Sequence, residues 1–204
     1  MTTESRADES RRPAGLTPSQ TVGPFFAYML TPHDYPTRAV FSNDLATPDA
    51  AGARVRVEGY VLDGDGAPII DAVIELWQAD GDGRYVTQAG GNAAFTGFGR
   101  TDTDSNGFYS FSTVRPGRVA GPGGSLQAPH VNVGVFARGL LKRLFTRLYF
   151  EGEAGNEADP ILALVPEARR GTLIAKRSER GADTVYTFNI RLQGDADETV
   201  FFEN

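Results

Sequence analysis

The sequence predicts a mainly β protein with a single core, arranged as a β-sandwich or a barrel. Three observations support this class. The chain has 204 residues, a length that one β-sandwich can reach. It contains 24 glycines and 12 prolines, which is typical of many short strands joined by turns. From residue 54 onwards, apolar and polar residues alternate in several short segments, as they do along half-buried strands.

The predicted strands follow one another along most of this region, separated by Gly, Pro, Asp and Asn. They cover residues 54–62, 69–78, 107–114, 130–136, 143–150, 184–192 and 198–202. Helices are predicted only within residues 160–176, where Pro166 would open the second of two short helices.

The N-terminal quarter of the chain has a different composition. Residues 1–15 are polar and charged, which predicts a flexible tail. Residues 16–53 contain the stretch LTPSQTVGPFFAYML, whose apolar end needs a surface to pack against. We expect this segment to be an arm that packs on a partner chain, followed by a β-sandwich domain over residues 54–204.

Composition excludes several functions. The formal net charge is −6 and no long basic cluster occurs, which argues against nucleic acid as a partner. Without cysteine there is no disulfide, thiolate metal site or cysteine nucleophile. No apolar run approaches the ~20 residues of a membrane span, and the first residues lack the apolar segment of a secretory signal. A cytoplasmic location is therefore the default expectation.

Two local motifs are better explained as turns or chance than as sites. Residues 102–107, DTDSNG, resemble the start of an EF-hand loop, but Thr113 stands where the loop needs a bidentate glutamate. We therefore interpret Asn106-Gly107 as a hairpin turn. Ser125 lies near His130, yet no nucleophile-elbow pattern surrounds it, which argues against acyl transfer.

The segment APHVNVGVF, residues 128–136, places a histidine and an asparagine on one face of a predicted strand. His130 and Asn132 are two positions apart, and alternate strand residues share a face. The pair has the spacing of a two-ligand metal clip with one ligand replaced. A lone histidine on an apolar strand is more often a packed core residue, so the residues alone leave both interpretations open.

A longer stretch, VEGYVLDGDGAPIIDAVIELWQADGDGRY at residues 57–85, resembles the signature of the intradiol ring-cleaving dioxygenases. TPSQTVGPFF, PHVNVGVFARG, TRLYFEGE, TLIAKR and ETVFFEN continue the resemblance from about residue 16 to the end. It implies a β-sandwich core with a non-haem iron(III) centre. Within the family, the sequence is similar to the alpha-type chain of the two-chain members. These cleave protocatechuate with O2 to 3-carboxy-cis,cis-muconate in aromatic catabolism.

The resemblance implies an iron site made of two tyrosines and two histidines in the catalytic chains. At the matching positions this sequence has Tyr85, Val119, His130 and Asn132, so two of the four ligands are absent. An arginine that lies over the substrate ring in catalytic chains is replaced by Gln127. We therefore expect no metal on this chain, a vestigial site at these four positions, and Fe(III) in a partner beta-type chain.

The same resemblance implies that this chain forms part of the wall of the partner's substrate pocket. The matching residues are Thr21, Gly23, Pro24 and Phe25, where relatives often have tyrosine in place of Phe25, together with Arg138. Arg138 would recognise the carboxylate of protocatechuate, since an arginine fork suits a carboxylate. An ion pair between Arg138 and a carboxylate of the partner is the alternative.

Two other functions stay open from the sequence. One is an enzyme that is active by itself, with Tyr85, His130 and either Asp80 or Asp82 building an atypical iron site. The other is a stand-alone β-sandwich binding module.

Overall fold

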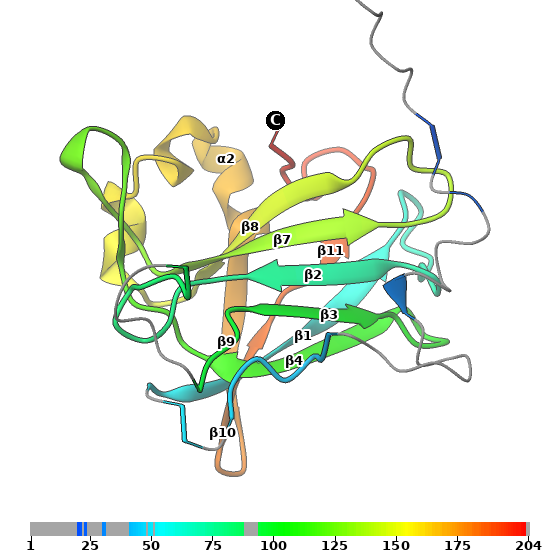
Figure 1. Cartoon of the computed structure of the whole chain (residues 1–204). Helices are drawn as coiled ribbons and strands as arrows, with labels where there is room; N and C mark the ends of the chain where they lie inside the picture. The colour runs from blue at the N-terminus through cyan, green and yellow to red at the C-terminus, as the bar shows by residue number, and fades with distance from the viewer. Residues whose placement is uncertain are drawn as a thin grey trace, which may run out of the picture.

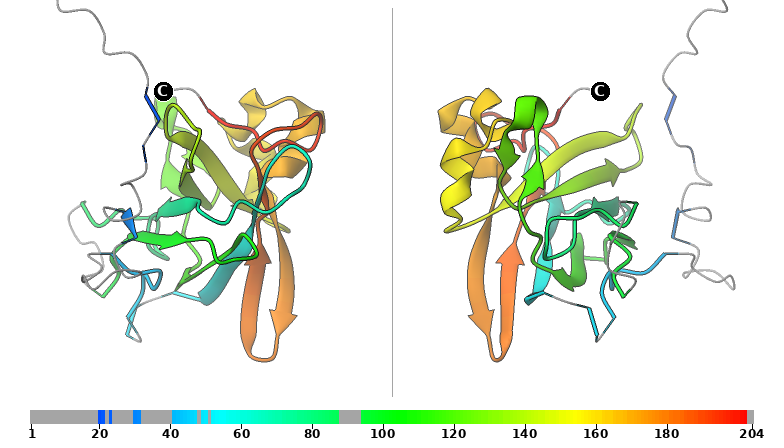
Figure 2. Two further views of the ribbon diagram at one scale, coloured as in Figure 1. Left: turned by 90° about the vertical axis from the view of Figure 1, so that its right-hand side faces the viewer. Right: turned by 60° about the vertical axis from the view of Figure 1, so that its left-hand side comes forward.

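The computed structural model describes residues 41–47, 49–50, 52–87 and 94–202, together with the single positions 20, 21, 23, 30 and 31. The chain forms two packed layers of β-strands, seen face-on in Figure 1 and from two other sides in Figure 2. The front sheet has the order β3 (Phe98–Asp102), β2 (Val73–Trp77), β7 (His130–Phe136) and β8 (Leu144–Phe150), with all neighbours antiparallel. These layers confirm the predicted mainly β sandwich.

The back sheet has the order β4 (Phe108–Val114), β1 (Arg54–Leu62), β10 (Asp183–Thr187) and β9 (Ile174–Arg180). The short β11 (Ile190–Arg191) continues beyond β10 and also runs parallel to β1. The two sheets join at one edge, where the end of β8 pairs in parallel with the start of β9 through Tyr149 with Ile174 and Phe150 with Ala175. The chain therefore makes one nearly closed sheet that is folded into two layers.

The main core fills the space between the layers because alternate strand residues point inwards. On the front sheet, Ile74, Val133 and Leu148 are essentially buried, and on the back sheet Val57 and Phe111 face them. A smaller cluster lies on the other side of β8 and is built from Ala128, Tyr149, Leu162, Val165 and Leu173. Short helices therefore cover one end of the outer face of the front sheet.

Three of these helices confirm the prediction for residues 160–176, namely η5 (Leu162–Leu164), α2 (Glu167–Arg170) and η6 (Gly171–Leu173). η4 (Ala154–Ala158) precedes that range and was not expected, and the last predicted residues, 174–176, already belong to β9. Pro166 occupies the N-cap position of α2, one residue before the position expected for an N-terminal proline. None of the helices in the described part of the chain is long and apolar enough to cross a membrane.

Several strand predictions need correction. β3 and β9 were not expected, because β3 contains Gly99 and two charged residues, and most of β9 is exposed and polar, so neither shows an apolar alternation. Gly99 is required by packing, since a Cβ there would lie 2.8 Å from the backbone oxygen of Ser42 as well as 2.4 Å from Leu45 Cδ1. The predicted strand at residues 198–202 makes only one isolated bridge, from Phe145 to Phe202. The first half of the predicted strand 69–78 is a turn.

The motif at residues 102–107 is a turn, but it does not close a hairpin. The Asp104 carboxylate accepts hydrogen bonds from Asn106 N (2.7 Å) and Phe108 N (3.0 Å), and Gly107 has a positive φ of 73°. β3 pairs with β2, whereas β4 pairs with β1. The turn therefore passes the chain from the front sheet to the back sheet, and the prediction of a hairpin was wrong.

Part of the predicted arm packs on this chain's own sandwich. Leu45 is buried in the core, and its backbone N–H donates to Ser112 O of β4 at 2.9 Å. Ala46 forms a bridge with Phe95, just before β3. Packing of the rest of residues 16–53 on a partner, and the domain boundary at residue 54, stay predictions.

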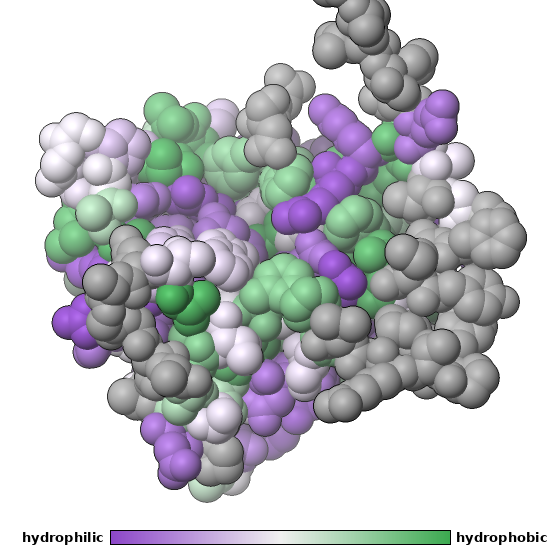
Figure 3. All heavy atoms as spheres, viewed as in Figure 1, coloured by the Kyte–Doolittle hydropathy of each residue, from purple (hydrophilic) through white to green (hydrophobic). Residues whose placement is uncertain are grey.

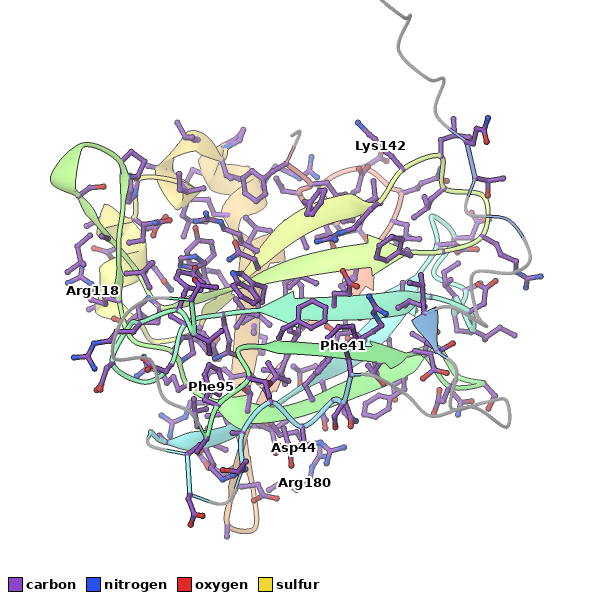
Figure 4. The ribbon with its side chains drawn as sticks, in the orientation of Figure 1. Phe41, Asp44, Phe95, Arg118, Lys142 and Arg180 are labelled. Carbon is purple, nitrogen blue, oxygen red and sulfur yellow. The ribbon has the colours of Figure 1, made fainter. Side chains whose placement is uncertain are left out.

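The back sheet contains a carboxylate that should make stability depend on pH. Glu58 of β1 accepts hydrogen bonds from Arg180 Nη2 at 2.7 Å and Arg56 Nε at 2.8 Å (Arg180 is labelled in Figure 4). Burial, which raises the pKa of Glu58, is the largest single influence. The hydrogen bonds and charges of Arg180 and Arg56 together outweigh it and hold the pKa below the ordinary value of 4.5.

A carboxyl group whose pKa is lower in the folded than in the unfolded state stabilises the fold above the unfolded pKa. This contribution is lost as the pH falls through the folded pKa. We therefore expect the urea midpoint of the wild type to fall more between about pH 6 and about pH 3 than that of Glu58→Gln. Glu167→Gln, which changes an exposed carboxylate of α2, is the matched control. Equal acid sensitivity of wild type and Glu58→Gln would contradict the assignment.

Candidate functional site

The outer face of the front sheet carries a row of polar and aromatic side chains across three strands. Trp77 of β2 is directly opposite Asn132 of β7, and Asn132 is directly opposite Arg147 of β8. Directly opposed residues of antiparallel strands project to the same face. Figure 3 shows this side of the molecule, where hydrophobic and hydrophilic side chains are mixed over the strands. Asn132, which lies on the strand predicted from the sequence, therefore points outwards, away from the main core.

His130 lies on the same strand and face, next to the short helices. Its side chain is buried, and Nδ1 is 2.8 Å from the carbonyl oxygen of Ala128. Since a carbonyl only accepts, Nδ1 carries the proton of the neutral ring. Burial lowers the pKa of His130, and the positive charge of Arg147 lowers it further. His130 is therefore a neutral, packed histidine beside Tyr149, whose ring centroid is 5.9 Å away.

Tyr85 follows a loop that brings it to this face. The buried Asp80 carboxylate accepts from Asp82 N at 3.0 Å and Arg84 N at 2.9 Å, which fixes the turn before Tyr85. The Tyr85 ring stacks on Trp77, with centroids 5.8 Å apart and an interplanar angle of 12°. Asn132 Nδ2 lies 3.5 Å from the Tyr85 hydroxyl oxygen. The structure thus brings Tyr85 and Asn132 together.

Val119 and Gln127 face each other in a small two-stranded hairpin. It consists of β5 (Val119–Ala120), η3 (Pro122–Gly124) and β6 (Leu126–Gln127), and Val119 pairs directly with Gln127. The Val119 side chain is buried. Gln127 Oε1 accepts a hydrogen bond from Arg147 Nη1 at 2.7 Å, so Gln127 is connected to the row on the front sheet.

The side chains at the four expected ligand positions do not suit iron(III). This hard cation favours phenolate and imidazole donors. Val119 has no donor atom, and Asn132 directs its NH2 group towards the Tyr85 oxygen. The guanidinium of Arg147 adds a positive charge near His130. Among the described residues, no group of three or more His, Cys, Asp or Glu could hold a metal ion. Asp80 is engaged in its turn, and Asp82 pairs with Arg84.

A second polar cluster lies in the next row of the face. The buried Glu75 carboxylate accepts from Arg100 Nε at 2.9 Å and lies 3.0 Å from Arg143 Nη1. Gly134 makes room for this arrangement, since a Cβ there would lie 2.7 Å from Arg143 Nε. The Arg143 guanidinium also lies over the Phe145 ring, 4.3 Å from its centroid. Glu75 is thus charge-compensated by two arginines.

A pocket of about 390 Å³ opens over these two rows. Its lining combines the aromatic residues Trp77, Phe98, Phe145 and Phe202 with the polar residues Asn132 and Arg147. The volume falls within the range of small-molecule sites. The pocket includes only Asn132 of the four expected ligand positions.

The residues predicted to form the wall of a partner's pocket are described in part. Thr21 is exposed and Gly23 has a positive φ of 75°, whereas Pro24 and Phe25 lie outside the described residues. The Arg138 side chain is 69% exposed and forms an ion pair with Asp71 in the turn before β2. Its role at a partner's pocket is not tested by this contact.

Three important residues were not singled out in the sequence. Glu75 could have been found as a charged residue inside an otherwise apolar strand. Arg147 lies in a strand whose alternation marks its face, but its position opposite Asn132 required the pairing of β7 with β8. Asp159 precedes a proline and a short helix, a pattern typical of a capping residue. It accepts from Tyr149 Oη at 2.9 Å and three backbone N–H groups.

Comparison with known proteins places this arrangement among the dioxygenases. The family model described as "Dioxygenase" matches residues 22–194. The chain is 47% identical to the protocatechuate 3,4-dioxygenase alpha chain of Burkholderia cepacia, covering 92% of this chain and 96% of that one. It is 45% identical to the alpha chain of Pseudomonas putida with the same coverage. It is 36% identical to a beta chain of B. cepacia, over 74% of this chain and 69% of that one.

Solved structures agree on the fold. The dioxygenase domain of a dioxygenase carbohydrate-binding protein fusion from Streptomyces sp. SirexAA-E superposes with a TM-score of 0.59 at 28% identity, covering 78% of this chain and 94% of that one. Hydroxyquinol 1,2-dioxygenase from Pseudomonas putida DLL-E4 has a TM-score of 0.62 at 20% identity, covering 89% and 68%. The chain thus shares the fold of these dioxygenases. The chain belongs to the intradiol ring-cleavage dioxygenase family.

Proposed function

We propose that this chain acts as the iron-free alpha-type subunit of a protocatechuate 3,4-dioxygenase, an oxidoreductase that cleaves protocatechuate with O2. The observation that carries the proposal is its likeness to two alpha chains over 96% of their length. Val119 and Asn132 at two of the four ligand positions support it, because neither side chain is a ligand that iron(III) favours. The homology with a beta chain is consistent with a partner of related fold.

In this proposal the iron(III) resides in a beta-type partner chain, where it would supply the activation of the catechol ring towards O2. The contribution of this chain is to shape the partner's pocket through Thr21, Gly23, Pro24 and Phe25. A phenylalanine at position 25 offers a ring without a hydroxyl group, so this part of the wall would be apolar.

Arg138 is proposed to attract and orient the carboxylate of protocatechuate. Its guanidinium is largely exposed and is held by Asp71, which leaves further N–H donors for an anion. In the complex with a beta-type chain, Arg138→Ala should raise KM for protocatechuate about tenfold, as expected for losing one hydrogen-bonded charge pair. KM for uncharged catechol should change little.

Arg177→Ala is the matched control, since Arg177 is an exposed arginine of β9 that pairs with Glu179. Asp71→Asn removes the charge that pairs with Arg138 and so tests whether Asp71 positions this arginine. This variant should leave KM for catechol unchanged. Equal rises in KM for both substrates, together with weaker subunit association, would instead assign Arg138 to an ion pair with the partner.

The proposed function is tested by producing the chain alone and together with a beta-type chain from the same source. We expect the isolated chain to be colourless, free of stoichiometric iron and inactive. The complex should contain iron, show the red-brown colour of phenolate bound to iron(III), and cleave protocatechuate. An isolated chain that is coloured, iron-loaded and active would overturn the proposal. A chain that associates with no partner would favour a stand-alone binding module.

A further inference from the structure

The pocket over the front sheet contains a guanidinium that pairs with no carboxylate in the part of the chain that the structure describes. Arg147 is half-buried, and it donates a hydrogen bond to the neutral side chain of Gln127. Within the described residues it forms no ion pair. The nearby Asp159 carboxylate is occupied by Tyr149 and backbone N–H groups. A partly desolvated charge is costly unless it is compensated, so this position favours an incoming anion.

The charges around the pocket add to this preference. Glu75 and Arg143 also line the cavity, and Glu75 is shared with Arg100. With the nearby Asp159, two carboxylates stand against three guanidinium groups, which leaves one positive charge in excess in a chain whose net charge is −6. The neighbouring His130 is buried and supplies no negative charge. The local field therefore attracts anions.

The rest of the lining selects a flat apolar ligand. Trp77, already stacked on Tyr85, lies in the same cross-strand row as Arg147, with Asn132 between them. Phe98, Phe145 and Phe202 complete an aromatic surround. A single aromatic ring could pack against these side chains while its carboxylate accepts a forked pair of hydrogen bonds from Arg147. A volume of about 390 Å³ accommodates such a molecule.

We propose that this pocket is a non-catalytic binding site for a single-ring aromatic carboxylate, anchored by Arg147 and stacked beside Trp77. Thr21, Gly23 and Arg138 are not among the residues that line this pocket. The site requires neither a metal nor a beta-type chain, so it goes beyond the proposed function. If the pocket does not bind such a ligand, the proposed function of the chain in a complex still stands.

The test uses the full chain and 4-fluorobenzoate as the probe, observed by 19F NMR and calorimetry. We expect saturable binding with a Kd below about 1 mM. Trp77 is the sole tryptophan of the sequence, so its fluorescence should change along the same binding curve. Uncharged 4-fluorobenzyl alcohol should bind at least about tenfold more weakly, because it cannot engage the guanidinium as an anion.

Arg147→Gln should raise the Kd for 4-fluorobenzoate at least about tenfold, and Arg147→Lys should cause a smaller rise because it keeps the charge but loses the fork. Arg177→Gln, an exposed change on β9, should leave the Kd unchanged. Far-UV circular dichroism establishes that each variant is folded, and the alcohol comparison tests the wild type should Arg147→Gln not fold.

Three results obtained with the chain alone would overturn the proposal. They are the absence of saturable binding, equal affinity for the acid and the alcohol, and an unchanged Kd in folded Arg147→Gln. Loss of 4-fluorobenzoate binding when a beta-type chain is bound would also overturn it. That outcome would assign the pocket to the contact surface of the partner.

Discussion

Asp159→Ala is expected to lower the free energy of unfolding by about 3–5 kcal/mol. The side chain is completely buried, and its two oxygens accept four hydrogen bonds. Oδ1 accepts from the Tyr149 hydroxyl and from the backbone N–H groups of Ile161 and Leu162, and Oδ2 accepts from Ala128 N at 2.8 Å. Truncation would leave several buried donors without acceptors, and this cost exceeds that of a cavity alone.

The loss of stability should arise from the elements that Asp159 connects. Asp159 connects the start of η5, the strand β8 and the residue whose carbonyl holds His130. Asp159→Asn keeps one acceptor oxygen but replaces the other with an NH2 group, which cannot accept from the buried donors. We therefore expect an intermediate loss of about 1–3 kcal/mol. Asp195→Ala, an exposed change, should be nearly neutral. Urea titrations followed by circular dichroism measure all three, and a neutral Asp159→Ala would contradict the network.

Gly59→Ala is expected to destabilise the chain by about 3 kcal/mol or to prevent folding. A Cβ at this position of β1 would lie 1.9 Å from the Phe188 carbonyl oxygen and 2.6 Å from its carbon. The obstacle is backbone, and two hydrogen bonds fix it. Phe188 N donates to Glu58 O at 2.7 Å, and the Tyr109 hydroxyl donates to Phe188 O at 2.6 Å.

Gly171→Ala is the matched control for this prediction. Gly171 has a negative φ at the end of α2, and a Cβ there would meet no atom within 4 Å. Alanine should leave stability unchanged or raise it by up to about 1 kcal/mol, since it restricts the unfolded chain. Both variants can be compared by their urea midpoints, and equal midpoints would show that β1 and Phe188 can separate at little cost.

The strands that the sequence predicted correctly are those with one apolar face. β1, β4, β7 and β8 bury alternate residues, so their periodicity is visible along the chain. β9 escaped prediction because it is held mainly by pairing with β10 while most of its side chains are exposed. β3 is short and is stabilised from outside by Leu45 and by the Arg100–Glu75 pair, neither of which leaves a local pattern.

The residues of the candidate site could likewise be predicted only in part. Tyr85, His130 and Asn132 could be singled out because they lie within recognisable motifs, and the strand alternation placed the last two on one face. The role of Arg147 could not be predicted, because it depends on its position opposite Asn132 and on its lack of an ion pair within the described residues. The residue opposite Asn132 is set by the register of β7 with β8, and that register became known only from the structure.

The parallel pairing of β1 with β10 affects how the protein is made in the cell. β1 lies in the first half of the chain, whereas its neighbours β10 and β11 come shortly before the C-terminus. During translation, one edge of β1 must therefore wait for residues 183–191 to leave the ribosome. An unpaired apolar strand edge invites association with other nascent chains. Ribosomal stalling or C-terminal truncation would thus release a species prone to aggregate, and chaperone capacity would influence the yield of soluble protein.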